Sequence, residues 1–126
     1  MAEVVLDASA VLALLNQEPG GDRVEPYLGK GVMSAVNAAE VLSKLVDGGL
    51  TTAEAKESLF LLGLRIVNFD SHDAEVVASL RTRTKPKGLS LGDRACVGLG
   101  LRLDALVVTA ERSWASLKIT EIDTIR

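Results

Sequence analysis

The chain has very few of the residues that build disulfide-linked or zinc-bound proteins. It contains one cysteine, Cys96, and one histidine, His72, among its 126 residues. A single cysteine excludes an intramolecular disulfide and a zinc site made of four cysteines. Cys96 lies among small apolar residues and His72 lies at an expected helix start, so we expect both to be structural. Any chemistry of this chain should therefore use other side chains.

Aromatic residues and long apolar runs are also scarce. Only 3% of the residues are aromatic, so the core must consist mainly of Val, Leu, Ile and Ala, which suits helices packed on a parallel sheet. No apolar run approaches the length of a membrane span, and the first residues do not resemble a secretory signal. We therefore expect one cytoplasmic domain over residues 1–126, with no membrane association.

The charge balance does not indicate a nucleic-acid-binding protein, because the formal net charge is −3. One segment departs from this average. Arg81, Arg83, Lys85 and Lys87 fall in a stretch without any acidic residue. Such a stretch can bind phosphate, although a solvated helix end is the more frequent explanation.

Strand-like and helix-like segments alternate along the chain, which predicts an α/β fold with a mainly parallel central sheet. The predicted strands are Val4–Leu6, Val32–Met33 with an extension to Ala35, Leu64–Phe69, Leu106–Val108 and Ile119–Ile125. The predicted helices contain Val11–Leu15, Val24–Leu28, Val36–Val46, Ala55–Leu62 and Ser71–Leu80, and two more begin at Ser90 and at Glu111.

Four carboxylates occur near the ends of predicted strands. Asp7 directly follows the first strand, Glu40 lies in the helix after the second, Asp93 begins the helix before the fourth, and Glu111 follows the fourth. Ligands of such folds gather outside the carboxyl ends of the strands. Carboxylates brought together there repel one another unless a cation is present, and Mg²⁺ or Mn²⁺ prefers oxygen ligands. An ion held this way can position a water molecule for phosphodiester hydrolysis.

Each of these acids also has an ordinary structural explanation. Asp7 can cap the first helix, and Asp93 can complete a capping box with Ser90. Glu111 can interact favourably with a helix N-terminus, and an exposed glutamate such as Glu40 is commonplace on a helix. Spacing alone therefore leaves both interpretations open.

At these acids the sequence resembles the PIN-domain family, and more closely the VapC-type toxins of bacterial toxin–antitoxin pairs. The resemblance rests on four short motifs in the family's order, which together span nearly the whole chain. They are residues 5–15 (VLDASAVLALL), 33–45 (MSAVNAAEVLSKL), 89–96 (LSLGDRAC) and 108–114 (VTAERSW).

The resemblance implies a three-layer α/β/α fold with about five strands and a metal-dependent endoribonuclease activity on RNA, with Mg²⁺ or Mn²⁺ as cofactor. It assigns metal binding and catalysis to Asp7, Glu40 and Asp93. Glu111 departs from the pattern, since many relatives have Asp there, and its longer side chain favours contact through water. Further residues are expected to hydrogen-bond near these acids (Ser9, Asn37, Thr109) or to contact RNA phosphate (Arg94, Arg112).

The resemblance also implies protein partners, namely a VapB-like antitoxin that covers the active site and a second copy in a homodimer. Two apolar stretches, Ala10–Leu15 and Leu59–Leu64, are candidates for a contact surface. Core packing explains most of their residues equally well.

Two further hypotheses compete with the nuclease. The first is a receiver-like phosphoacceptor signalling domain, since Thr109-Ala110 resembles the switch residues of such domains. The chain lacks the paired acids beside Asp7, a clear phosphoacceptor Asp closing the third strand, and the final Lys-Pro of a receiver. The second is a PIN fold that has lost catalysis and only binds a partner.

Overall fold

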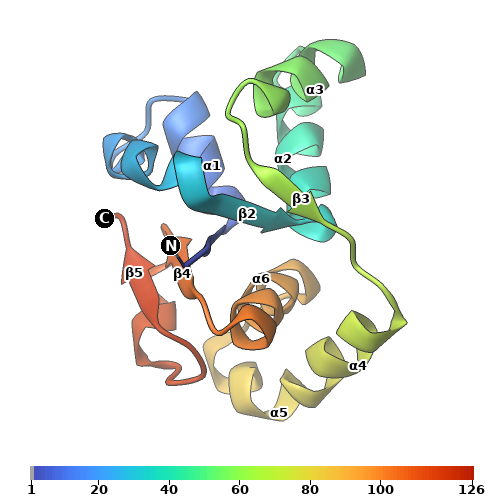
Figure 1. Ribbon diagram of the computed structural model, residues 1–126, viewed down its shortest axis with the longest axis vertical. Coiled ribbons are helices and arrows are strands. Elements are labelled where there is room, and N and C mark those ends of the chain that lie inside the picture. The colour runs from blue at the N-terminus through green and yellow to red at the C-terminus, as the bar shows by residue number, and fades with distance from the viewer. Residues whose placement is uncertain (1) are drawn as a thin grey trace.

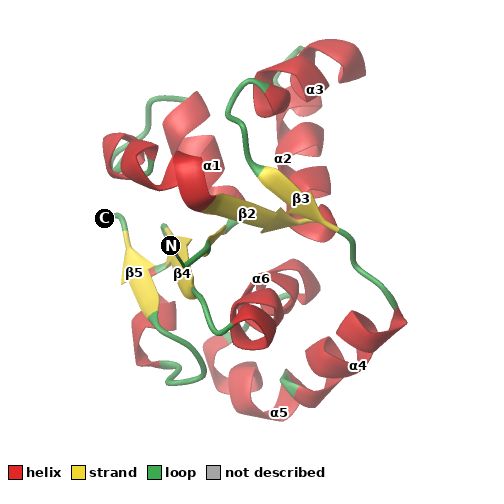
Figure 2. Cartoon of the chain, in the orientation of Figure 1, coloured by secondary structure: helices red, strands yellow, loops and turns green. Residues whose placement is uncertain are grey.

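The computed structural model describes residues 2–126, which form a five-stranded parallel sheet (Figures 1 and 2). The strand order is β3-β2-β1-β4-β5, and all four pairs are parallel. The strands are β1 (Val4–Leu6), β2 (Gly31–Ser34), β3 (Arg65–Val67), β4 (Leu106–Thr109) and β5 (Ile122–Thr124). The predicted α/β architecture is therefore confirmed, although the last strand is shorter than the predicted Ile119–Ile125.

The central strand β1 is buried on both faces, as its continuous apolar run indicates. Val4 and Leu6 belong to one core cluster, whereas Val5 between them belongs to the other. Successive side chains of a strand point to opposite faces of the sheet, so one short strand contributes to two cores. This arrangement produces the three layers.

The helices divide between the two faces of the sheet (Figure 1). Helices α1 (Ala8–Leu15), α2 (Ala35–Asp47) and α3 (Thr52–Phe60) cover one face, and α4 (Ser71–Ser79), α5 (Arg81–Thr84) and α6 (Leu91–Leu103) lie on the other. The chain also forms short 3₁₀ helices, which are η1 (Gly21–Arg23), η2 (Glu25–Lys30), η3 (Lys85–Lys87) and η4 (Arg112–Ser116). The predicted helix at Glu111 is thus only a 3₁₀ turn.

Local sequence explains where several helices begin. Thr51, Asp70 and Ser90 each form a capping box with the acidic residue three positions later. Ser90 is the predicted cap, and its partner is Asp93. Helix α5 was not predicted, because it occupies the basic stretch that ends in Lys85-Pro86-Lys87-Gly88 and carries little apolar periodicity.

The strand order also decides between two of the competing hypotheses. Receiver domains have the order β2-β1-β3-β4-β5. In this chain β3 lies at the edge of the sheet beside β2, and β1 pairs directly with β4. The receiver-like hypothesis is therefore wrong. Within residues 2–126, no helix is both long and apolar enough to cross a membrane.

Candidate metal centre

The order of the sheet reverses between β1 and β4, and a pocket of about 240 Å³ opens at the carboxyl ends of these strands. Such a switch point is the expected position of a ligand site in an open α/β sheet. The structure brings all four predicted acids to this pocket. Its lining residues are Asp7, Ala8, Ser9, Leu12, Glu40, Lys44, Asp93 and Glu111.

Asp7 is the most deeply buried of these acids, with only 3% of its surface exposed. Its Oδ2 atom accepts hydrogen bonds from Ser9 Oγ at 2.6 Å and from Thr109 Oγ1 at 2.9 Å. Asp7 occupies the N-cap position of α1, but its side chain makes no capping hydrogen bond. Capping therefore does not account for this buried carboxylate.

Ser9 and Thr109 are themselves held by the backbone that follows β4. Ser9 Oγ accepts a hydrogen bond from the Ala110 amide at 3.0 Å, and Thr109 Oγ1 accepts one from the Glu111 amide at 3.0 Å. Both hydroxyls are thus oriented to donate to Asp7. The predicted hydrogen-bonding residues Ser9 and Thr109 therefore lie together, with their hydroxyl oxygens 3.2 Å apart.

The environment of Asp7 raises its pKa from 3.8 to about 6. The main cause is burial, which disfavours the charged form, and the negative charges of Asp93 and Glu40 add to the effect. The hydrogen bonds from Ser9 and Thr109 act in the opposite direction and stabilise the carboxylate. The pocket therefore disfavours the charged form of Asp7, the most deeply buried of its acids.

Glu40 is oriented by Asn37, which is fully buried one turn earlier on α2. The Asn37 Nδ2 group donates to Glu40 Oε1 at 2.8 Å and to the carbonyl of Gly92 on α6 at 2.9 Å. A Cβ atom at Gly92 would lie 2.6 Å from Glu40 Oε2. Asn37 and Gly92 together fix the position of the Glu40 carboxylate against the start of α6.

Asp93 has the structural role that its capping box predicted, and it also lines the pocket. Its Oδ2 accepts a hydrogen bond from the Ser90 amide at 2.9 Å, and its own amide donates to Ser90 Oγ at 3.1 Å. Glu111 is exposed and makes no side-chain hydrogen bond within residues 2–126. Capping and pocket lining are therefore compatible at Asp93.

These carboxylates fit a hard divalent cation in their chemistry. Asp7, Glu40 and Asp93 each use one oxygen to accept hydrogen bonds, and their second oxygens accept none from residues 2–126. No three His, Cys, Asp or Glu side chains in that range are spaced to hold one ion together. Mg²⁺ is commonly bound by one or two carboxylates and several waters, so the open arrangement suits it.

The two arginines predicted to contact RNA lie in different settings. Arg94 Nη1 donates to the Val77 carbonyl on α4 at 2.9 Å, and Arg94 does not line the acidic pocket. Arg112 is exposed and follows Glu111 directly. An RNA contact for either residue stays a prediction.

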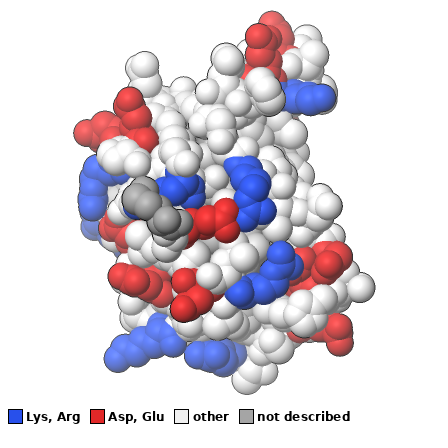
Figure 3. Space-filling view, in the orientation of Figure 1, with Lys and Arg blue, Asp and Glu red and all other residues white. Residues whose placement is uncertain are grey.

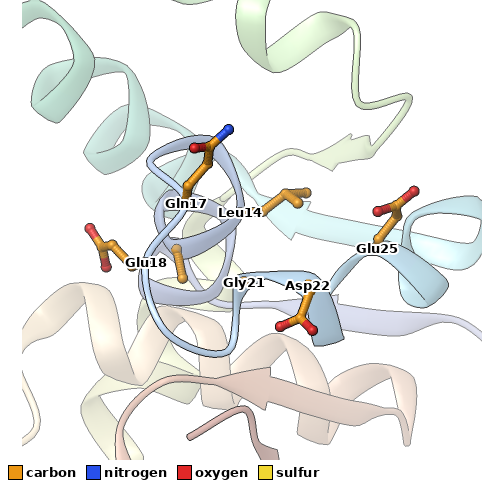
Figure 4. Close-up of a pocket in the computed structure, with 7 residues that line it drawn as sticks. Leu14, Gln17, Glu18, Gly21, Asp22 and Glu25 are labelled. Carbon is orange, nitrogen blue, oxygen red and sulfur yellow. The ribbon is translucent and has the colours of Figure 1, made fainter.

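A second hollow, of about 380 Å³, is larger than the acidic pocket but gathers no comparable set of ligands (Figure 4). It lies beside α1 and η1. Figure 4 shows that the side chains of Glu18, Asp22 and Glu25 point away from one another. The sheet's switch point, and not the volume of a hollow, identifies the candidate site.

Two residues of the site were missed by sequence reasoning. Lys44 lines the pocket four residues after Glu40, a spacing that places both side chains on one side of α2. Gly92 leaves room for the Glu40 carboxylate because it has no Cβ atom. The sequence signalled Gly92 only by its place next to Asp93. The contact between α2 and α6 that involves Gly92 is tertiary and has no local signature.

The raised pKa of Asp7 predicts a pH-dependent cost to stability. Well below pH 3.8 the carboxyl is protonated in both the folded and unfolded states, and the cost grows as the pH rises from there through the folded pKa of about 6. Asp7→Asn keeps the acceptor oxygen without the charge. In EDTA at pH 8, this variant should raise the free energy of unfolding by up to about 3 kcal/mol, since one pKa unit corresponds to about 1.4 kcal/mol.

Denaturant unfolding at pH 8 and pH 4 measures this difference, which should fall below about 1 kcal/mol at the lower pH. Glu57→Gln, which removes an exposed carboxylate on α3, is the control and should change stability little at either pH. A destabilised Asp7→Asn at pH 8 would contradict the electrostatic interpretation.

Comparisons with known proteins identify a family and similar folds. The PIN-domain family matches residues 4–119. No curated protein matches the sequence. Similar solved structures include DNA-bound VapBC from Salmonella typhimurium, with 16% identity, a TM-score of 0.74 and 100% of both chains covered. A toxin–antitoxin complex from Klebsiella pneumoniae has 16% identity, a TM-score of 0.78 and 98% of both chains covered.

VapBC-5 from Mycobacterium tuberculosis is 22% identical with a TM-score of 0.64, and the match covers 98% of this chain and 99% of that one. Likeness at this level of identity concerns the fold. The family match covers nearly all of the sequence and includes the four acids of the pocket. The chain therefore belongs to the PIN-domain family.

Proposed function

We propose that this protein is a cytoplasmic, metal-dependent endoribonuclease that hydrolyses RNA phosphodiester bonds and acts as the VapC-type toxin of a toxin–antitoxin pair. One observation carries the proposal. Asp7, Glu40 and Asp93 each have one oxygen held by a hydrogen bond and a second oxygen that accepts none within residues 2–126, around one pocket at the sheet's switch point. Membership of the PIN-domain family and the fold shared with VapBC structures support it.

In this proposal Asp7, Glu40 and Asp93 bind Mg²⁺ or Mn²⁺ partly directly and partly through its waters, and Glu111 contacts it through water. When bound, the ion activates a water molecule and stabilises the charge that develops on the phosphodiester. The protein's own contribution is positioning. Ser9 and Thr109 hold the Asp7 carboxylate, and Asn37 holds that of Glu40. Pre-oriented ligands avoid the cost of rearrangement during the reaction.

Cleavage of a mixed RNA pool, with and without Mg²⁺ or Mn²⁺, tests the proposal. The purified wild-type chain should cleave only with metal, and Asp93→Asn should lose activity by about a thousandfold, because the metal supplies several kcal/mol of transition-state stabilisation. Glu111→Gln should lose only about tenfold, since contact through water transmits less of that energy. The melting temperature of each variant checks that it is folded.

Metal-independent cleavage, or cleavage that survives in Asp93→Asn, would overturn the proposal. RNA that is bound but never cut by the folded, partner-free wild type would favour the remaining alternative, a catalytically silent PIN fold. Melting curves give a second readout, since Mg²⁺ should stabilise the wild type at pH 8 more than it stabilises Asp7→Asn.

Gly92→Ala tests the position of Glu40 without removing a charge. The added methyl group would overlap the Glu40 carboxylate, which can move because it ends a flexible side chain. Stability should therefore change by less than about 1 kcal/mol, as alanine also favours the helix. Cleavage should fall by about a hundredfold, because small displacements at a reacting centre are costly.

Gly98→Ala on the same helix is the matched control. A Cβ atom at Gly98 would meet the Val76 side chain on α4 at 3.3 Å instead of Glu40. Cleavage by the folded control should remain near that of the wild type. Equal activity of Gly92→Ala and Gly98→Ala would show that Glu40 does not need its observed position.

We also propose that the chain forms a homodimer. We further propose that it binds a VapB-like antitoxin through an apolar surface at the C-terminal end of α3. Of the two predicted stretches, α1 mainly fills the core, whereas Phe60 and Leu61 are 79% and 75% exposed. Beside them lies an apolar groove of about 260 Å³. Exposed apolar patches of this kind commonly mark protein contacts.

Light scattering and co-purification test these partners. The purified chain should have twice its mass of 13.3 kDa. Co-expressed with the product of a small gene immediately upstream, it should copurify as a complex. The double variant Phe60→Ser, Leu61→Ser should lose the complex, whereas Leu101→Ser, at another exposed leucine, should retain it. A monomeric mass would refute the homodimer, and capture by the double variant would refute the assigned surface.

A further inference from the structure

Lys44 is the single cationic side chain among the residues that line the acidic pocket. It lies on α2, four residues after Glu40, so both side chains project from one side of the helix. The pocket otherwise presents the carboxylates of Asp7, Glu40, Asp93 and Glu111. A basic side chain in this setting is either neutralised by one of them or available to an anion.

The structure favours the second case. Glu and Lys four residues apart on a helix commonly form an ion pair. Within residues 2–126, however, the ion pairs involve Arg23, Arg65, Arg102 and Arg126, and none involves Lys44. Lys44 is also exposed. On the face that Figure 3 shows, acidic and basic side chains are interspersed, and neither sign of charge dominates.

Lys44 also lines a third hollow, of about 340 Å³, and it is the residue that this hollow shares with the acidic pocket. The other lining residues of this hollow come from the end of α1, from the end of α2 and the turn after it, and from the last turn of α3; they are Leu15, Asn16, Leu45, Gly48, Leu50 and Ser58. None of them is charged. Lys44 therefore lines both the acidic pocket and a hollow whose other lining residues are uncharged.

We propose that Lys44 binds a backbone phosphate of the RNA strand next to the bond that is cut, and so directs the strand from the acidic pocket toward the third hollow. This inference rests on the proposed nuclease function. RNA is a polyanion, and the pocket carboxylates repel it except where the metal neutralises them. An ammonium group on a long flexible stem is suited to a phosphate contact that carries no base preference.

The test compares Lys44→Gln with Lys44→Arg and with Lys56→Gln, an exposed lysine on α3 that does not line either hollow containing Lys44. Lys44→Gln should lower kcat/KM about tenfold, mainly through KM, because a charge-assisted contact is lost. The slope of log(kcat/KM) against log salt should become shallower by about 0.7, the value for one phosphate contact on a single strand. Lys44→Arg should keep most of both properties.

Binding of a fluorescent RNA to Asp93→Asn, with and without Lys44→Gln, gives a readout that needs no cleavage. The added substitution should weaken binding about tenfold and reduce its salt slope by the same amount. Lys56→Gln should leave cleavage, binding and slope unchanged, and all variants should melt near the wild type.

The outcomes separate this inference from the proposed function. Wild-type cleavage together with an unchanged kcat/KM and salt slope in Lys44→Gln would overturn the role of Lys44 and leave the nuclease intact. An equal loss in Lys44→Gln and Lys56→Gln would also overturn it, because the effect would then be one of net charge. A wild type that neither binds nor cleaves RNA would overturn both.

Discussion

Burial of the Asp7 carboxylate is the constraint on which the site depends. A carboxylate removed from water is stable only if other groups replace its hydration. Here Ser9 and Thr109 replace it, and they come from the segments that follow β1 and β4. The Asp7 amide also donates to the Val108 carbonyl, which continues the β1–β4 pairing up to the acid itself. Pairing of β1 with β4 therefore also assembles the hydrogen bonds around Asp7.

The same arrangement explains why the site opposes the stability of the fold. Hydroxyl donors lower the pKa of Asp7, yet burial and the charges of Asp93 and Glu40 raise it further. A site optimised only for stability would hold a neutral residue at position 7. Retaining a buried acid among other acids is expected where the charge has a use, because strained or repulsive groups concentrate at functional sites.

Sequence patterns predicted the parts of the structure that depend on local order. The run Val4–Leu6 predicted a central strand, and Ser90 with Asp93 predicted the start of α6. The positions of all four acids followed from the rule that ligands gather at the carboxyl ends of strands.

The remainder could not be predicted because it depends on contacts between distant segments. The hydrogen bond from Asn37 to the Gly92 carbonyl joins residues 55 positions apart, and no local pattern encodes it. The short helix α5 has too little apolar periodicity to be recognised. Arg94 lies beside Asp93 in sequence, but the helix turns its side chain to α4, where it donates to Val77. Neighbours along a helix point in different directions, so sequence adjacency does not place two side chains in one site.

Asp93 shows that a structural and a chemical role do not compete at one residue. A carboxylate has two oxygens, and a capping box requires only one of them. The Ser90 amide engages Oδ2, and the same bond fixes the side-chain rotamer of the residue that lines the pocket. Asn37 acts on Glu40, and Ser9 and Thr109 act on Asp7, in the same way. In each case one oxygen accepts the hydrogen bond that orients the side chain and the second oxygen accepts none, and at Asp93 the capping bond itself does this.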